Sequence, residues 1–254
     1  MWLRLSVLFF SVLCPCVAAF AVSPQKTHLI AFEFGPYINK NLPEGGAVIA
    51  GLKEMYRKNG QELVVTFAPV IRTKKHAAEN NKFDGYFPAT AENIQKNFTL
   101  SSIVHSSSWG LAERTDNPVR WNKFEDLGKY KIGNVIGYDL AAVLIPLNAA
   151  GKLKIEDGPT DELNLVKLAN GRLDLVFIDE GLFDGLLQTS KQLQPFKTKL
   201  QFNAKPIEHY DYGVAFKDTD RGRKALNSFN GVFDSKEFAI SVGTYLKKNK
   251  KLFE

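Results

Sequence analysis

The sequence of 254 residues predicts an α/β protein built as two lobes. Strand and helix patterns alternate in the order β-α-β-α-β, which indicates a parallel sheet covered by helices. The same order starts again after a break at Asp116-Asn117-Pro118, and two helical segments follow the second unit. Two such units, followed by two helical segments, suggest two lobes with a cleft between them. Clefts of this kind are common ligand sites.

The first unit contains three strand patterns and two helix patterns. Val48, Leu52 and Met55 have helical spacing, and Gly60 ends that helix. We therefore predict, in order, a strand at Thr27–Phe32 ended by Gly35-Pro36, a helix at Ala47–Asn59, a strand at Leu63–Phe67, a helix at Arg72–Asn80 and a strand at Phe83–Phe87.

The second unit repeats this order. Its last strand is apolar throughout, which is typical of a strand buried on both faces. We predict a strand at Tyr130–Ile136, a turn at Gly137-Tyr138-Asp139, a helix from Leu140 to about Ala149, a strand at Leu153–Glu156, a helix at Leu163–Leu168 capped by Thr160-Asp161-Glu162 and stopped by Asn170-Gly171, a strand at Leu173–Ile178, a late strand at Tyr212–Phe216, and helices at Thr219–Phe229 and Ser235–Lys248.

Residues 1–21 have the layout of a secretory signal peptide. Arg4 precedes an apolar run, and Ala19-Phe20-Ala21 offers a small-x-small cleavage site. A membrane anchor is the alternative, but the run from Leu5 to Leu13 is short for a span of ~20 residues. We expect cleavage after Ala21 and a location in the periplasm.

Both cysteines, Cys14 and Cys16, lie inside this segment, so the mature chain is expected to have no disulfide and no cysteine metal site. A chain of this length can bury a sufficient core without them. The net charge of +6 comes from lysines spread along the chain, with the densest run at Lys247–Lys251. Nucleic-acid binding needs basic residues concentrated on one face, so we expect no nucleic-acid partner.

Four segments, in this order along the chain, resemble a known family. They are Phe34-Gly35-Pro36-Tyr37, Pro69–Arg72 with Phe83–Pro88, Phe124–Gly133, and Leu168–Asp174 with Phe177–Asp179. They are similar to the aromatic-Pro-aromatic loop, the PWxR and DGxFP motifs, the DLxGxxIG segment and the LxxGRxDxxxxD motif of family 3 of the bacterial extracellular solute-binding proteins, the polar amino acid group of type II periplasmic binding proteins.

The resemblance implies a Venus-flytrap architecture. Residues 22–112 and 214–254 would form the first lobe, and residues 113–213 would form the second. Two crossovers, near Ala112 and Gly213, would form the hinge, and the lobes would close around a ligand.

The resemblance also implies roles in ligand binding. Asp179 matches the position that takes a ligand's ammonium group, although it suits a helix N-cap equally. Phe34 and Tyr37 offer a wall for a cation, or pack in the core. Arg72 suits a ligand carboxylate, or forms a salt bridge.

Further candidates lie at the entry to the second lobe and after the third strand. Tyr138 and Asp139 would stand at a helix N-terminus facing the cleft, where anions bind, although Asp139 itself suits an N-cap. Thr90, after the third strand, and Glu33, before the aromatic loop, complete the candidate set.

The sequence departs from the family pattern in one important place. After the third strand the family has an arginine that holds the ligand's α-carboxylate, but Pro88–Lys96 contains none. Glu92 and Gln95 lie near the expected place, and Lys96 could replace the arginine only as a point charge. We therefore hypothesise that Glu33, Asp139 and Asp179 make the cleft acidic and favour an amine-bearing or cationic ligand.

The leading interpretation is a monomeric binding protein that captures a small polar, amine-bearing or amino-acid-like solute for an ABC importer or a sensor, with no cofactor and no metal. A periplasmic lyase or dehydratase on the same fold is the first alternative, with Glu180 or Glu33 as acid or base. The four histidines show no metal-ligand spacing. A degenerate interaction module that binds no ligand is the second alternative.

Overall fold

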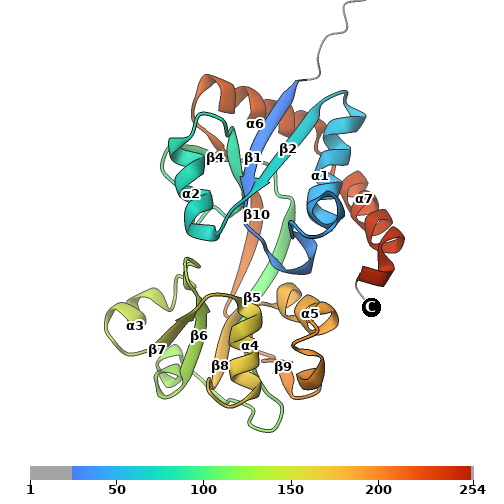
Figure 1. Ribbon diagram of the computed structural model, residues 1–254. Helices are drawn as coiled ribbons and strands as arrows, with labels where there is room; N and C mark the ends of the chain where they lie inside the picture. Colours follow the sequence, from blue (N-terminus) through green and yellow to red (C-terminus); the bar gives the residue numbers. More distant parts are fainter. Residues whose placement is uncertain (1–24, 253–254) are drawn as a thin grey trace, which may run out of the picture.

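The computed structural model describes residues 25–252 and has two lobes (Figure 1). Two long strands, β5 (His105–Arg114) and β10 (Glu208–Lys217), run from one lobe into the other. They pair with each other at the centre of the path β2-β1-β3-β10-β5-β8-β6-β7, and β4 and β9 pair with β10 and β5 off this path. The predicted two-lobed α/β fold is confirmed.

The first lobe has a mostly parallel sheet. Its β1 strand pairs in parallel with β2 and β3, and β10 closes the sheet by pairing antiparallel with β3 and β4. Helices cover this sheet, as its parallel connections require. The elements are β1 (Lys26–Ala31), α1 (Ala47–Lys58), β2 (Glu62–Phe67), α2 (Val70–Glu79), β3 (Gly85–Ala89), β4 (Phe98–Leu100), α6 (Asp220–Val232) and α7 (Ser235–Lys248), with short 3-10 turns η1 (Gly35–Tyr37), η2 (Pro43–Gly45) and η5 (Lys250–Leu252).

The second lobe repeats the plan around β6. This strand pairs in parallel with β7 and β8, and β5 pairs antiparallel with β8 and β9. The elements are η3 (Phe124–Lys129), β6 (Lys131–Val135), α3 (Ile145–Ala149), β7 (Lys154–Gly158), α4 (Asp161–Ala169), β8 (Leu175–Asp179), α5 (Glu180–Thr189), η4 (Gln194–Phe196) and β9 (Leu200–Phe202).

Strand pairing changes where the chain passes between the lobes. β10 pairs with β5 up to Tyr212 and with β3 from Gly213, close to the expected second crossover. β5 begins to pair with β8 at Trp109, before Ala112. The lobe division at residues 112 and 214 stays a prediction.

The Asp84-Gly85 pair of the DGxFP motif holds the first lobe together. The buried Asp84 carboxylate accepts hydrogen bonds from the backbone N–H of His28 (2.7 Å) and from Nε of Arg221 (2.5 Å). A Cβ on Gly85 would lie only 2.2 Å from the carbonyl oxygen of Ala215 on β10. The motif therefore joins β1, β3, β10 and α6, which is a structural role.

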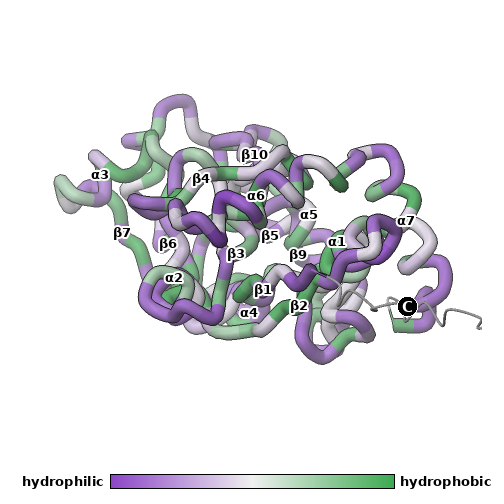
Figure 2. The backbone as a smooth tube through the Cα atoms, turned by 90° about the horizontal axis from the view of Figure 1, so that it is seen from above, coloured by the Kyte–Doolittle hydropathy of each residue, from purple (hydrophilic) through white to green (hydrophobic). Residues whose placement is uncertain are grey.

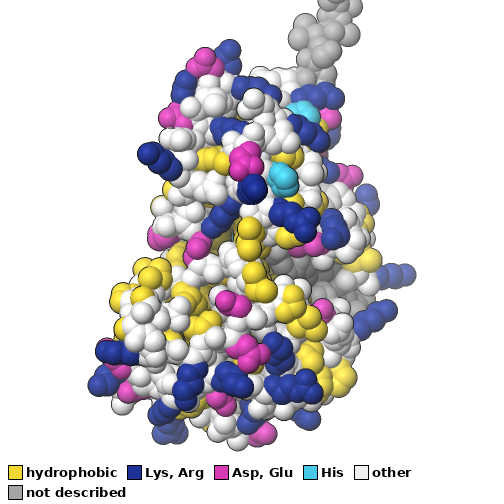
Figure 3. Space-filling model, turned by 60° about the vertical axis from the view of Figure 1, so that its left-hand side comes forward, with side chains coloured by type: hydrophobic (Ala, Val, Ile, Leu, Met, Phe, Trp, Pro, Cys, Tyr) yellow, Lys and Arg dark blue, Asp and Glu magenta, His cyan; other side chains and the backbone are white. Residues whose placement is uncertain are grey.

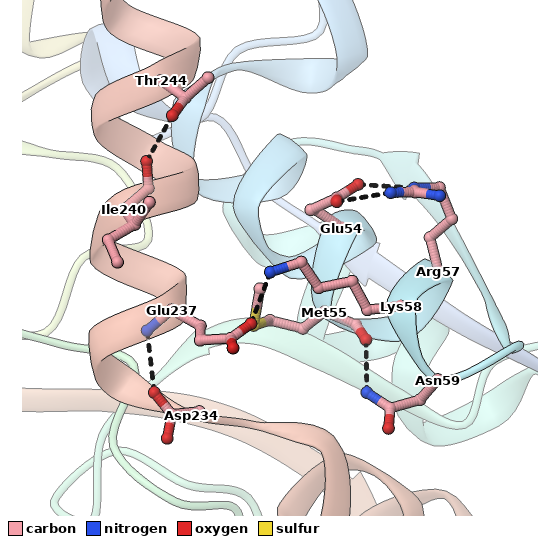
Figure 4. Close-up of polar contacts among 9 residues, drawn as sticks. All are labelled: Glu54, Met55, Arg57, Lys58, Asn59, Asp234, Glu237, Ile240 and Thr244. Carbon is pink, nitrogen blue, oxygen red and sulfur yellow. Dashed lines mark hydrogen bonds and ion pairs between the residues drawn. The ribbon is translucent and has the colours of Figure 1, made fainter.

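The last long helix packs on α1 of the first lobe (Figure 4). The Lys58 ammonium pairs with the Glu237 carboxylate at 2.5 Å, and the Asp234 side chain caps α7 by accepting from the N–H of Glu237 at 2.8 Å. A Cβ on Gly51 would lie 2.8 Å from the Phe238 ring, so the two helices approach closely. The basic end of α7 has Lys247 and Lys248 in its last turn, where cations are favoured.

The helix predicted from Leu140 is wrong in its first half, because α3 begins only at Ile145. Pro146 explains the difference: its ring clashes with the carbonyl four residues earlier, so it is tolerated only in a first helical turn. Figure 2 shows α3 and the segment before it as hydrophobic chain at the outer edge of the second lobe. Sequence reasoning also missed β4, β5 and β9, and it anticipated α5 only through the N-cap alternative for Asp179.

Lysine and arginine side chains are scattered over the face seen in Figure 3, and hydrophobic side chains gather around the level where the lobes meet. Among residues 25–252, no helix is long and apolar enough to cross a membrane. The predicted signal peptide lies outside the described residues.

We expect Asp84→Ala to lower the free energy of unfolding by about 1–3 kcal/mol, because the N–H of His28 would lose its buried acceptor. Urea denaturation measures this loss. Asp220→Ala is the control, since Asp220 pairs with Arg223 on the surface, where ion pairs contribute little. Equal losses in the two variants would contradict a structural role for the motif.

Candidate functional site

The cleft between the lobes holds two cavities. The first has a volume of about 310 Å³ and the second about 700 Å³. Phe32, Val70 and Tyr138 line both, so these three side chains form the wall between them. Residues of β3, β5 and β10 line the first cavity, and residues of the η1 turn and of the N-terminal end of α4 line the second.

Phe34 places an aromatic ring of the first lobe against the second lobe. Its ring centroid lies 5.7 Å from that of Tyr212, 6.2 Å from Trp109 and 6.4 Å from Tyr138. Gly35 permits this entry because it has a φ of 62°, and a Cβ there would lie 2.4 Å from Leu182 of α5. Phe34 packs against three of the hydrophobic cores, including both cores of the second lobe.

Trp109 and Tyr212 lie on the two strands that connect the lobes. The indole Nε1–H of Trp109 donates to the Tyr212 hydroxyl at 2.5 Å, and both side chains are buried. Burial and the Asp179 carboxylate raise the pKa of Tyr212. Burial and Glu208 raise the pKa of Tyr210, so both phenols stay protonated.

Polar groups enter the first cavity from both lobes. The Lys74 ammonium of α2 pairs with the Asp139 carboxylate of the second lobe at 2.9 Å. Thr90 is 1% exposed, and its hydroxyl has no hydrogen-bond partner among the described residues. Glu92 and Asn93 follow it along the lining, and Asn93 accepts from the N–H of Thr90 at 3.0 Å. Within the described part of this lining Lys74 is the only cation, and it is already paired.

Asp161 is the polar centre of the second cavity. The Tyr138 hydroxyl donates to its Oδ2 at 3.1 Å, while its Oδ1 has no hydrogen-bond partner among residues 25–252. The residue is only 7% exposed, and burial raises the pKa of its carboxyl to about 7. In the same lining, Glu33 pairs with Lys40 at 3.3 Å and Glu162 accepts from Ser190.

Asp179 lies beneath the aromatic cluster and outside the lining of both cavities. It is 2% exposed and stands beside Trp109 in the register of β5 and β8. Its Oδ1 accepts from the N–H of Leu182 at 2.8 Å, so the N-cap alternative is confirmed. Burial raises the pKa of this carboxyl, although a hydrogen bond from Ser107 opposes the shift. Its role toward a ligand stays a prediction.

Of the other predicted residues, five line a cavity and two do not. Phe34, Thr90, Tyr138 and Asp139 line the first cavity, and Glu33 and Tyr138 line the second. Tyr37 and Arg72 line neither; Tyr37 is half-buried in η1, and Arg72 is exposed on α2.

The predicted helix N-terminus at Tyr138 and Asp139 is wrong. No helix begins there, and Asp139 pairs with Lys74 across the cleft instead of capping a helix. Proline in the next segment delays the helix, as described above. An anion site made of free helix N–H groups is therefore not present at these two residues.

Sequence reasoning missed Trp109, Tyr210 and Tyr212 as cavity residues. The strand β5 carries three consecutive serines before Trp109, and no local pattern shows that this strand pairs with β10. Asp161 was assigned only to a helix cap, and Thr160 in fact makes that cap by accepting from the N–H of Leu163 at 3.2 Å. A helix-capping pattern in the sequence does not indicate that the acidic residue after the cap, here Asp161, lines a cleft.

We expect Asp161→Asn to flatten the dependence of stability on pH. An Asp with a folded pKa near 7 binds its proton more tightly when folded, so it stabilises the fold at low pH and this stabilisation is lost as pH rises from about 4 to 7. For each protein, the free energy of unfolding at pH 4 is subtracted from that at pH 8. This difference should be about 2–4 kcal/mol more positive in the variant than in the wild type.

Urea denaturation at a series of pH values measures this gain. Asp116→Asn is the matched control, because Asp116 lies on the same lobe with a side chain that is 79% exposed. Parallel pH profiles for the wild type and Asp161→Asn would contradict the raised pKa.

No protein-family model matches the sequence, and no curated protein matches it either. Solved structures match its fold over most of both chains. The GluR0 ligand-binding core from Nostoc punctiforme in complex with L-glutamate has a TM-score of 0.67 at 16% identity, covering 87% of this chain and 98% of that chain.

Two further solved structures are similar. The P235GK mutant of ArgBP from T. maritima has a TM-score of 0.68 at 18% identity, covering 87% of this chain and 95% of that chain. An amino acid ABC transporter substrate-binding protein from Streptococcus pneumoniae bound to L-arginine has a TM-score of 0.67 at 17% identity, covering 90% and 96%. These similarities show that the chain has the two-lobed fold of periplasmic binding proteins.

Proposed function

We propose that this chain is a solute-binding protein that holds a small amine-bearing or cationic ligand in the first cavity. The observation that carries the proposal is the composition of this lining. Aromatic rings from both lobes surround a space with two carboxylates, Glu92 and Asp139, and with no uncommitted cation among the described lining residues.

The aromatic rings favour a cation energetically. A cation over an aromatic face gains about 0.5–2 kcal/mol, and the gain is larger where water is excluded. Phe34, Tyr138, Tyr210 and Tyr212 offer such faces in the first cavity. Thr90 adds a buried hydroxyl that can accept a hydrogen bond from an ammonium group.

A ligand with a free carboxylate fits this lining poorly. The stretch in which the resemblance leads one to expect an arginine supplies Glu92, Asn93 and Ile94 instead. Such a ligand would have to separate Lys74 from Asp139 to find a cation. This exchange would expose the Asp139 carboxylate to the ligand's own negative charge.

The geometry supports capture by closure of the lobes. The Lys74–Asp139 pair joins the lobes directly, and Phe34 packs against the second lobe. A ligand that contacts both lobes stabilises the closed arrangement because only that arrangement makes all the contacts. Delivery to an ABC importer in the periplasm, or to a sensor, is the biological setting that we propose for a monomer of this fold.

Binding without turnover is also part of the proposal. The two carboxylates considered as acid or base, Glu33 and Glu180, are exposed and lie outside the first cavity. Glu33 is paired with Lys40. Two of the similar solved structures are a ligand-binding core and a substrate-binding protein.

We expect organic amines to stabilise the protein in a thermal-shift screen that also contains neutral amino acids and organic acids. A ligand at about 100 times its dissociation constant adds about 2.7 kcal/mol of stability, which is readily measured. Glu92→Gln should weaken the best amine about fivefold, since it removes one charge-assisted partner.

Glu125→Gln is the matched control, because Glu125 is exposed on η3 and lines neither cavity. It should leave the affinity unchanged. A screen in which organic acids stabilise the protein and amines do not would refute the proposed ligand class.

A further inference from the structure

We infer that the second cavity is a separate binding site for an organic ammonium group, with the Asp161 carboxylate as its anchor. The site lies across the wall of Phe32, Val70 and Tyr138 from the first cavity. It goes beyond the proposed function and does not require that the first cavity bind a ligand.

The unpartnered Oδ1 of Asp161 is the first argument. Tyr138 satisfies only the other oxygen of the carboxylate, and the residue is more than nine-tenths buried. A buried acceptor without a partner destabilises the fold, and it does so more strongly when it is charged. This cost is relieved when a donor in the cavity reaches Oδ1.

The charge of the lining is the second argument. Three acidic residues, Glu33, Asp161 and Glu162, line the second cavity, and Lys40 is the one basic residue in its described lining. Lys40 is held by Glu33 at 3.3 Å on the first-lobe side of the cavity, so it does not neutralise Asp161. A cation is therefore favoured over an anion.

The shape and polarity of the lining favour an organic cation. Leu182, Leu186 and Val135 supply apolar wall for an alkyl chain, and Thr160 and Ser190 supply hydroxyls. An ammonium group has three donors, which suit Oδ1 and neighbouring oxygens. Ca²⁺ needs six to eight oxygen ligands, and no cluster of three or more metal-ligating side chains exists among the described residues.

Proton release distinguishes this site. The Tyr138 phenol donates a hydrogen bond to Asp161. The other titratable groups around Asp161 are the carboxylates of Asp179, Glu162 and Glu33 and the ammonium of Lys40. Because burial holds the pKa of Asp161 near 7, an alkylammonium bound there expels the proton of the carboxyl. Alkylammonium groups stay protonated below pH 9, so affinity should rise about tenfold from pH 6 to pH 8 as Asp161 ionises.

The test uses isothermal titration with n-butylammonium chloride on the protein comprising residues 22–254. Titrations at pH 7 in two buffers of different ionisation enthalpy measure the protons released. The variants are Asp161→Asn, Glu92→Gln in the first cavity, and Asp116→Asn as a charge-matched surface control. Asp161→Asn retains the Thr160 cap, so it should remain folded.

We expect the wild type, Glu92→Gln and Asp116→Asn to release protons on binding, and Asp161→Asn to lose both the release and the pH dependence. Release that persists in Asp161→Asn, or no heat with the wild type at pH 8, overturns the site. Calcium chloride that displaces the amine also overturns it. If Glu92→Gln abolishes all binding while Asp161→Asn changes nothing, the proposed function survives and this inference fails.

Discussion

The packing of Phe34 against the second lobe is the contact on which the cleft depends. Phe34 follows β1 in the chain, and its ring packs near the rings of Trp109, Tyr138 and Tyr212. Aromatic rings bury large areas and lose little conformational freedom, so a few of them can define an interface. Because Phe34 contacts cores of both lobes, its position sets how far the lobes stand apart.

The strands β5 and β10 give that contact a fixed frame. They pair with each other between the lobes, and the Trp109–Tyr212 hydrogen bond joins their side chains in the lining of the first cavity. A buried, satisfied bond of this kind orients both rings. Tyr138 then divides the cleft, with its ring against Trp109 on one side and its hydroxyl on Asp161 on the other.

The sequence was a good guide to elements with strong local patterns. The helix α1, the buried strand β8 and the Thr160 cap follow from spacing and composition, and all three are present. The error at Leu140 came from giving too little weight to Pro146, whose effect is also local. The cleft was harder, since Trp109 and Asp161 acquire their positions from contacts between distant segments, and periodicity reports only the near neighbours of a residue.

The candidate set drawn from the resemblance had a similar limit. Motif residues such as Asp84 and Gly85 have structural roles here, and Asp179 caps α5 below the cavities. A family motif marks positions that the fold needs as well as positions that touch a ligand. Function must therefore be argued from the site and not from the motif.

The two buried carboxylates of the second lobe show how the fold and the site are connected. Asp161 is the first residue of α4 and Asp179 caps α5, and the charge of Asp179 adds to burial in raising the pKa of Asp161. Asp179 accepts from the N–H of Leu182 and Asp161 accepts from the Tyr138 hydroxyl, and each carboxylate keeps one oxygen without a partner among the described residues. Only Asp161 lines a cavity, whereas Asp179 lies outside the lining of both. A cation in the second cavity therefore lies next to Asp161 and not next to Asp179, and there it offsets the cost of a buried carboxylate.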